Sequence, residues 1–281
     1  MQMAATTEDR SQLVAKLTAL AKGFRVDIID MLEKAGSGHP GGSLSVIDIV
    51  TALYFHEMKH DPKNPKMADR DRFVLSKGHA VPAQYAAMAG AGYFDKAALS
   101  SLRHIGGLQG HPVNTATAGI EACTGSLGQG LSIAQGMAMA AKADGKDFRV
   151  YCVIGDGEMQ EGQIWEAAFS CAKYKLDNLV CILDWNKAQI DGYCEEVMPL
   201  LPIAEKWAAF NWNVIEIDGN DMGQILDAFD KARATKGKPT FILANTVKGK
   251  GVSFMENQVG WHGAAPNKDQ AKQAIEELTR A

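Results

Sequence analysis

A Gly-Asp-Gly turn at residues 155–157, followed thirty positions after its aspartate by Asn186, constrains the fold more than any other feature of the chain. The β-branched apolar run 149–156 is typical of a buried parallel strand, and the run 178–186 is typical of another. The segment between them has the spacing of a helix. Asp156 and Asn186 therefore fall at the carboxyl ends of two strands, and open α/β sheets bind their ligands outside those ends.

These two side chains offer oxygen atoms that suit a divalent cation. Asp156 supplies a carboxylate and Asn186 an amide oxygen, and Mg2+ prefers octahedral oxygen coordination that phosphate and water can complete. Gly157 lets the backbone approach a phosphate closely, and the helix that follows turns its first N–H groups toward the same anion. The pattern predicts a metal-diphosphate site, although an ordinary strand-to-helix turn can have the same residues.

The remaining segments predict a doubly wound α/β fold, in which helices cover both faces of a mostly parallel sheet. Further strands are expected at 72–76, 213–218 and 240–247, and helices at 11–34, 46–55, 131–143, 163–175 and 222–235. We see no internal repeat and no Pro/Gly-rich linker. The 281 residues are therefore expected to form a single domain over residues 1–281.

Composition excludes several classes of partner. The formal net charge is −4 and no basic tract stands out, so nucleic acid is not an expected ligand. No apolar run is long enough to cross a bilayer, and residues 1–12 lack the features of a signal peptide. The five cysteines form no CxxC pair, and we interpret them as buried free thiols of a protein in the reducing cytoplasm.

Seven motifs, which together span nearly the whole chain, resemble the transketolase family in sequence and in order. They are SGHPGGSLS (37–45), SKGHA (76–80), GHP (110–112), GSLGQG (125–130), GDGEMQEG (155–162), QIDG (189–192) and WHGAAP (261–266). The Gly-Asp-Gly turn with its distant Asn is similar to the thiamine diphosphate signature. The resemblance implies the diphosphate-binding domain of that fold, with thiamine diphosphate and Mg2+ as cofactors and Ca2+ or Mn2+ as substitutes for Mg2+.

Four histidines lie in these motifs, and the other three are interpreted as structural. A neutral imidazole both donates and accepts hydrogen bonds, which suits a polyhydroxylated sugar phosphate. The resemblance implies that His39 and His111 line the substrate channel at the reacting end. It also implies that His79 contacts the cofactor diphosphate and that His262 contacts both the diphosphate and the substrate.

The glycine-rich motif at 125–130 reads at first as a tight loop before a closely packed helix. The resemblance adds cofactor contacts from Gly125, Ser126 and Leu127. Ser126 stands where the family usually has Pro, which leaves the backbone contact intact but loosens the turn.

The resemblance also assigns the metal ligands, which are Asp156, Asn186 and the backbone carbonyl of Ala188. Gly157 is assigned to the cofactor. Lys187 stands where the family usually has Gly, and it can be read either as a neighbour of the diphosphate or as an ordinary solvated lysine.

Charged residues near the motifs have simple structural explanations. Glu161 and Glu166 lie at the start of the helix after the Gly-Asp-Gly turn, where negative charge stabilises the helix dipole. By resemblance they lie at a subunit contact that connects two active sites, which makes Glu161 a candidate catalytic residue. Lys248 and Lys250 are interpreted as part of a mobile loop rather than as a phosphate clamp.

The resemblance implies a second chain. Transketolases place the glutamate that activates the cofactor in a separate pyrimidine-binding domain, and this chain resembles the diphosphate-binding half. We expect the partner to be a C-terminal transketolase subunit that carries the pyrimidine and C-terminal domains. The smallest assembly with two complete sites is then a heterotetramer with two copies of each subunit.

The implied function is that of the N-terminal subunit of a split transketolase, which moves a two-carbon ketol unit from a ketose phosphate to an aldose acceptor. Three alternatives stay open. The alpha subunit of a 2-oxo-acid dehydrogenase is also a diphosphate-binding half, but SGHPGG, GHP and WHG favour transketolase. Deoxyxylulose phosphate synthase is a single longer chain. A non-catalytic binding protein is disfavoured by the intact Asp156, Asn186 and motif histidines.

Overall fold

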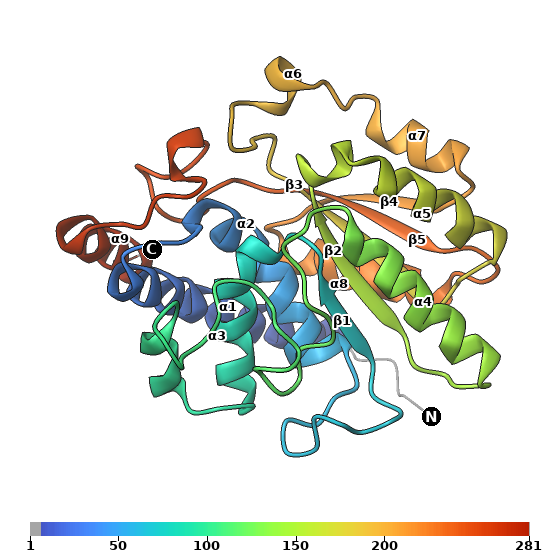
Figure 1. Cartoon of the computed structure of the whole chain (residues 1–281), viewed down its shortest axis with the longest axis horizontal. Helices are drawn as coiled ribbons and strands as arrows, with labels where there is room; N and C mark the ends of the chain where they lie inside the picture. The colour runs from blue at the N-terminus through green and yellow to red at the C-terminus, as the bar shows by residue number, and fades with distance from the viewer. Residues whose placement is uncertain (1–6, 281) are drawn as a thin grey trace.

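The computed structural model describes residues 7–280, which contain a five-stranded sheet with all neighbouring strands parallel (Figure 1). The order of the strands across the sheet is β1-β2-β3-β5-β4. Their bounds are β1 (Arg72–Leu75), β2 (Val150–Gly155), β3 (Leu179–Trp185), β4 (Asn213–Asp218) and β5 (Thr240–Asn245). The predicted α/β fold is confirmed, and each strand matches one that the sequence predicts.

Successive side chains of the inner strands enter two separate apolar cores. In β2, Tyr151 and Val153 belong to one core, whereas Cys152 and Ile154 belong to the other. Neighbouring side chains on a strand point to opposite faces of the sheet. A strand in which every side chain is apolar must therefore be packed against other elements on both faces. The unbroken apolar runs of the sequence therefore correspond to a sheet between two layers of helices.

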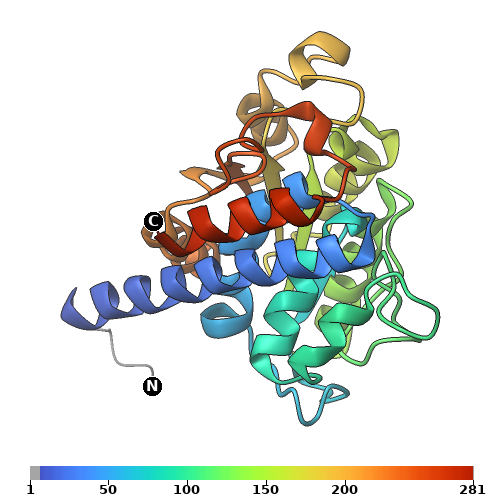
Figure 2. The same cartoon turned by 90° about the vertical axis from the view of Figure 1, so that its left-hand side faces the viewer.

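More helices pack on one face of the sheet than on the other. One core contains residues of α1 (Thr7–Ala35), α2 (Pro40–Ala52), α3 (Val81–Ala91), α8 (Met222–Ala234) and α9 (Lys268–Arg280). The other contains residues of α4 (Gln129–Ala143), α5 (Gly162–Lys173) and α7 (Ile203–Ala209). In the first layer α9, near the C-terminus, lies alongside the N-terminal α1 (Figure 2).

Short helical turns lie in the connections between these elements. They are η1 (Leu53–Glu57), η2 (Gly78–Ala80), η3 (Lys96–Ser101), η4 (Glu158–Gln160), α6 (Cys194–Val197) and η5 (Val259–Trp261). Two of them, η2 after β1 and η4 after β2, follow a strand closely, so motif residues are held in short turns at the carboxyl edge of the sheet. Lys77 follows β1, Asp156 follows β2 and Asn186 follows β3, as the sequence predicts for the last two.

The helix expected over 46–55 begins earlier than predicted. It starts at Pro40, inside the first motif, and every residue of α2 is buried. Proline suits the first position of a helix because its missing N–H would have no partner there. Gly41 is required for the close packing of this turn, since a Cβ at Gly41 would lie 2.9 Å from the carbonyl oxygen of Trp261. Residues 40–45 of the motif are therefore part of the helix.

Two other sequence-based expectations concern the cysteines and the membrane. All five cysteines are free, but Cys123 is exposed, so the prediction of buried thiols is correct only for the other four. Within residues 7–280, no helix combines the length and the apolar character needed to cross a bilayer. Residues 1–6, where no signal peptide is expected, lie outside the described part of the chain.

Two glycines of α4 test how closely this helix packs on the sheet. A Cβ at Gly130 would lie 2.7 Å from the Cα of Ser76, whereas a Cβ at Gly136 would meet nothing within 4 Å. We expect Gly130→Ala to destabilise the isolated chain by about 1–3 kcal/mol through overpacking. The control Gly136→Ala should be neutral or stabilise it by up to about 1 kcal/mol. Urea unfolding measures both, and equal effects would contradict the packing described for Gly130.

Candidate functional site

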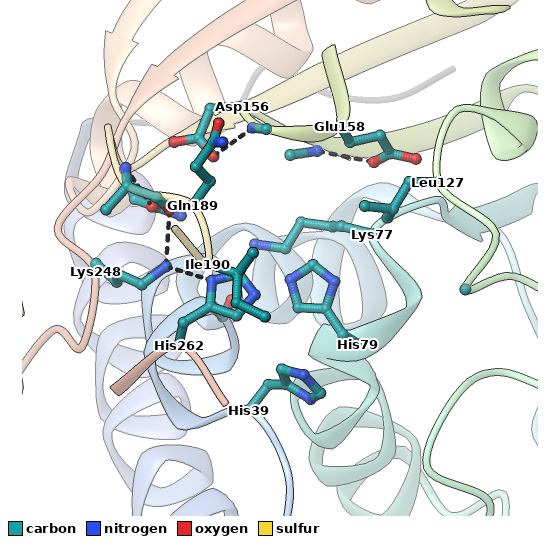
Figure 3. A pocket seen from close by; sticks show the side chains of 16 residues that line it. His39, Lys77, His79, Leu127, Asp156, Glu158, Gln189, Ile190, Lys248 and His262 are labelled. Atoms are coloured by element: carbon teal, nitrogen blue, oxygen red, sulfur yellow. Dashed lines mark hydrogen bonds between the residues drawn. The ribbon is translucent and has the colours of Figure 1, made fainter. Parts of the chain in front are cut away.

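A cavity of about 280 Å3 opens at the carboxyl edge of the sheet (Figure 3). Its wall contains most of the residues that the sequence assigned to the cofactor, the metal and the substrate. These are His39, His79, Gly125, Leu127, Asp156, Gly157, Asn186, Ala188 and His262. The fold thus brings together motifs from both ends of the chain.

Four residues that the motifs assigned to the site or to a subunit contact lie outside the cavity wall. His111 is close to it, with its ring centroid 6.4 Å from that of His39. Ser126 belongs to the glycine-rich loop but does not line the cavity. Glu161 is an exposed residue at the N-cap of α5, and Glu166 is exposed further along the same helix. Their role at a subunit contact stays a prediction.

Asp156 carries a carboxylate of which one oxygen is unpartnered. Its Oδ1 accepts a hydrogen bond from the N–H of Gly157 at 2.8 Å, while Oδ2 has no hydrogen-bond partner in the described structure. The residue is only 4% exposed. Burial, together with the nearby carboxylate of Asp184, raises the pKa of Asp156 to about 6. A buried carboxylate with a free oxygen is suited to bind a cation.

Asn186 and Ala188, the other two expected metal ligands, follow β3. The Oδ1 of Asn186 accepts from the N–H of Ala188 at 3.3 Å, and its Nδ2 donates to Asp184 at 3.0 Å. The carbonyl oxygen of Ala188 accepts from the ammonium of Lys248 at 2.9 Å. Lys187 has a left-handed φ of 69° and an exposed side chain, and it does not line the cavity.

The prediction that Lys248 lies in a mobile loop is wrong. Lys248 is 1% exposed and lines the cavity, with its ammonium 3.1 Å from Nδ1 of His262. Burial lowers its pKa to about 8. The turn is held against α2, because the N–H of Gly249 donates to the carbonyl of Gly41 at 3.0 Å. Only Lys250 behaves as a surface lysine, with a side chain that is 40% exposed.

A buried ion pair between Lys77 and Asp184 lies at the base of the site. The ammonium of Lys77 contacts Oδ2 of Asp184, and the two side chains are 2% and 0% exposed. Asp184 also accepts hydrogen bonds from the hydroxyls of Ser45 and Thr246. Burial alone would raise the pKa of Asp184, but Lys77 and these hydrogen bonds bring it below its ordinary value. The pair is therefore ionised and joins the ends of β1 and β3.

Glu158 is a second buried carboxylate of the cavity wall that the sequence did not indicate. Its two oxygens accept hydrogen bonds from the N–H groups of Gly128 and Gly155, each at 3.0 Å, and it also accepts from the hydroxyl of Ser76. Burial raises its pKa. Glu158 joins the end of β2 to the turns at Ser76 and Gly128. Because both of its oxygens are occupied, it is less suited than Asp156 to bind a metal.

Three histidine rings form one wall of the cavity (Figure 3). The ring centroid of His39 lies 5.1 Å from that of His79 and 5.6 Å from that of His262. Burial, and then nearby cationic groups, lower the pKa of His39 to about 4 and that of His262 to about 3. Burial lowers the pKa of His79 and His111 in the same direction. All four rings are therefore neutral near pH 7 and can both donate and accept hydrogen bonds.

Glycines leave backbone rather than side chains at part of the wall. A Cβ at Gly78 would lie 2.8 Å from the backbone nitrogen of Gly125, and a Cβ at Gly157 would lie 3.0 Å from the Cβ of Gln189. Gly125 also has a φ of 133°, which side chains disfavour. Gly125 and Gly157 line the cavity, and without side chains their backbone lets a phosphate group approach closely.

The donor set fits a cation that the protein shares with a phosphate. Within residues 7–280, no group of three or more His, Cys, Asp or Glu side chains is arranged to hold a metal alone. The site offers instead the carboxylate of Asp156, the amide of Asn186 and the backbone carbonyl of Ala188. Three such ligands suit Mg2+, which usually takes only a few ligands from the protein. The free Oδ2 of Asp156 supplies the charge that such an ion needs.

The rim of the cavity includes Gln189 and Ile190, which belong to the QIDG motif but were not assigned a role from it. Gln189 accepts a hydrogen bond from Nε2 of Gln160 at 2.7 Å. Ile190 lines the cavity although its side chain is 66% exposed. The QIDG motif was a signal that Ile190 could have a role in the site. Only the fold shows that its side chain is exposed beside the cavity.

The variant Asp184→Ala tests the dependence of the fold on the buried ion pair. It leaves the ammonium of Lys77 buried without its partner, which costs about 3–5 kcal/mol of unfolding free energy. The control is Asp30→Ala, in a pair with Lys34 whose side chains are 48% and 46% exposed. Its loss should cost less than about 1 kcal/mol. Urea unfolding measures both, and similar costs would show that the buried pair is dispensable.

Comparison with known proteins agrees with the motifs. The family model described as "Transketolase, thiamine diphosphate binding domain" matches residues 17–279. The 6-deoxy-6-sulfo-D-fructose transketolase subunit of Clostridium sp. (strain MSTE9) is 47% identical over 253 residues, which cover 90% of this chain and 92% of that subunit. An apulose-4-phosphate transketolase subunit of Phocaeicola vulgatus is 44% identical over 256 residues, 91% of each chain.

Comparison with solved structures supports the same family. The transketolase from Leishmania mexicana superposes with a TM-score of 0.89 at 32% identity, covering 94% of this chain and 41% of that one. The chain thus spans about two fifths of the length of that transketolase, whereas it spans nearly all of the two relatives named as subunits. The family match decides against the other thiamine diphosphate enzymes that the sequence left open. The chain belongs to the transketolase family and is its thiamine diphosphate-binding domain.

Proposed function

We propose that this chain is the N-terminal subunit of a two-chain transketolase, which anchors thiamine diphosphate and Mg2+ and is active only with its partner. One observation carries the proposal. The buried carboxylate of Asp156, with one free oxygen, lies in the same cavity as the buried ammonium groups of Lys77 and Lys248. A carboxylate with one free oxygen, beside two ammonium groups, suits a ligand that combines a metal ion with a diphosphate.

In this proposal the metal is held by Asp156, Asn186 and the carbonyl of Ala188, and Ca2+ or Mn2+ can replace Mg2+ because all three ligands are oxygen atoms. The diphosphate is held by His79 and by the backbone of the glycine-rich loop. Lys248 adds positive charge, since a pKa of about 8 leaves it largely protonated at pH 7.

Thiamine diphosphate, when bound, supplies a nucleophilic carbon and an electron sink for breaking the carbon bond beside the ketose carbonyl. The role of this chain is to bind and orient the sugar. In our proposal His39, His111 and His262 face it. Because these rings are neutral near pH 7, each can donate a hydrogen bond to the carbonyl oxygen or accept a proton from a hydroxyl.

The proposed partner is a C-terminal transketolase subunit that carries the pyrimidine domain and the activating glutamate. Exposed apolar side chains support a protein contact near the cavity: Ile190, which lines it, and Met198 and Leu201, which follow in the same segment, are 66%, 55% and 57% exposed. In a heterotetramer with two copies of each subunit, Glu161 and Glu166 would lie at the contact that connects the two sites.

The proposed donor is a ketose with an anionic end group. One relative is named for 6-deoxy-6-sulfo-D-fructose and another for apulose 4-phosphate. A sulfonate and a phosphate monoester are both anions at neutral pH. The net charge of this chain is −4, so recognition of such a substrate requires a local cationic group rather than the field of the whole protein. The buried free thiols support a cytoplasmic location for the enzyme.

Asp156→Ala tests the metal site. The variant removes the charged ligand, so thiamine diphosphate should no longer bind in an Mg2+-dependent way, while the circular dichroism spectrum stays that of the wild type. The control Asp144→Ala removes an exposed carboxylate at the end of α4 and should bind as the wild type does. Calorimetric titration of the cofactor into the complex with the partner chain, with and without Mg2+, measures the affinity. Unchanged affinity in Asp156→Ala would exclude this site.

Reconstitution tests the two-chain enzyme. The isolated chain should bind thiamine diphosphate weakly and transfer no ketol group, because in our proposal the partner supplies the activating carboxylate. Co-expression with the product of the adjacent reading frame should restore transfer from a ketose phosphate donor, with the two chains in a one-to-one ratio by analytical ultracentrifugation. Full turnover by the isolated chain, once mass spectrometry has excluded a contaminating transketolase, would refute the proposal.

A further inference from the structure

Lys248 is fixed in the cavity wall by the start of α2. Its alkyl chain packs on Gly41, where a Cβ would lie 3.0 Å from Cγ and 3.2 Å from Cε of the lysine. Its backbone is held as well, because its carbonyl accepts from the N–H of Asn257 at 2.9 Å and the N–H of Gly249 donates to Gly41 at 3.0 Å. The residue is only 1% exposed. A lysine packed in this way cannot turn its ammonium out into the solvent.

The ammonium of Lys248 contacts one of the proposed metal ligands. It donates to the carbonyl oxygen of Ala188 at 2.9 Å and to Nδ1 of His262 at 3.1 Å (Figure 3). A carbonyl oxygen has two lone pairs, so the second one stays free for a metal ion. A divalent ion on this oxygen would have the fixed ammonium as its direct neighbour, and the two cations would repel each other.

Each buried ammonium of the cavity wall has a carboxylate as its counter-charge. Lys77 is paired with Asp184. Burial lowers the pKa of Lys248, and the charge of Asp156 is the largest influence against that shift. Burial and Asp184 raise the pKa of Asp156, and Lys248 is the largest influence in the opposite direction. A metal ion and Lys248 therefore compete for the negative charge of Asp156.

We propose that Lys248 makes metal binding conditional on the diphosphate: its fixed positive charge opposes a divalent ion alone and favours the ion together with an anionic diphosphate. The inference rests on the proposed function, since it takes Asp156, Asn186 and Ala188 to hold the metal. Two of the three N–H groups of the ammonium have partners, and among residues 7–280 the third has none. This N–H is available to a phosphate oxygen, whose negative charge offsets the repulsion between the lysine and the metal.

The test compares two ligands, Mn2+ alone and the Mg2+ complex of thiamine diphosphate, in the variant Lys248→Met. This variant should bind Mn2+ alone about 10-fold more tightly, because the repulsion is removed. It should bind the Mg2+ complex roughly 10- to 100-fold more weakly, because a charge-assisted hydrogen bond is lost. Electron paramagnetic resonance measures free Mn2+, and calorimetry measures binding of the Mg2+ complex. Both use the assembly with the partner chain, and the Mn2+ measurement is repeated with this chain alone.

Three further variants separate the charge of Lys248 from its packing. Lys248→Gln keeps an N–H donor without the charge, so it should resemble Lys248→Met and replaces it if methionine prevents folding. Lys248→Arg keeps the charge and should retain the wild-type preference for the Mg2+ complex over Mn2+ alone. Lys250→Gln removes a 40% exposed charge from the same turn and should bind both ligands as the wild type does. Circular dichroism shows whether each variant is folded.

The outcomes separate the inference from the function on which it rests. A purely structural lysine would weaken both ligands when replaced, so weaker or unchanged Mn2+ binding in the two neutral variants would overturn the inference. Unchanged binding of the Mg2+ complex would overturn it as well. Absence of ketol transfer by the wild-type assembly with every donor would overturn the proposed function instead. Mn2+ binding by this chain alone needs neither the partner nor a sugar, so it would still decide the role of Lys248.

Discussion

The buried ion pair between Lys77 and Asp184 is the interaction on which the arrangement of the site depends. A charge in an inner strand is tolerated only when it is paired and hydrogen-bonded. The partner comes from the end of β1, on the far side of β2, so the pair crosses the middle of the sheet edge. Ser45 in α2 and Thr246 after β5 donate to the same carboxylate. One buried charge therefore holds four segments of the chain in register.

Three buried carboxylates at this edge have different roles because their surroundings differ. Asp184 is neutralised by an ammonium group, and Glu158 is saturated by three hydrogen-bond donors. Asp156 alone among them keeps a free oxygen. All three side chains, of Asp156, Glu158 and Asp184, carry the same carboxylate group. The number of donors that the fold supplies decides which carboxylate is left for a metal ion.

The cavity changes in character from its base to its mouth. Buried charges of both signs lie at the strand ends, and neutral imidazoles form the adjoining wall. In our proposal this order matches the ligands, with the metal and the diphosphate at the base and the reacting sugar carbons along the histidines. The exposed apolar rim around Ile190 then leaves room for the partner subunit.

The sequence by itself determined the strands, the parallel sheet and the family, because these depend on local periodicity and on motifs that keep their spacing. It also placed Asp156 and Asn186 at one sheet edge. It could not define α3, whose residues are nearly all apolar and buried, since such a helix has no amphipathic period. The burial of Lys248 in the cavity wall was decided only by the tertiary structure. A lysine becomes buried and hydrogen-bonded through segments distant in sequence, and those contacts exist only once the sheet and its loops are assembled.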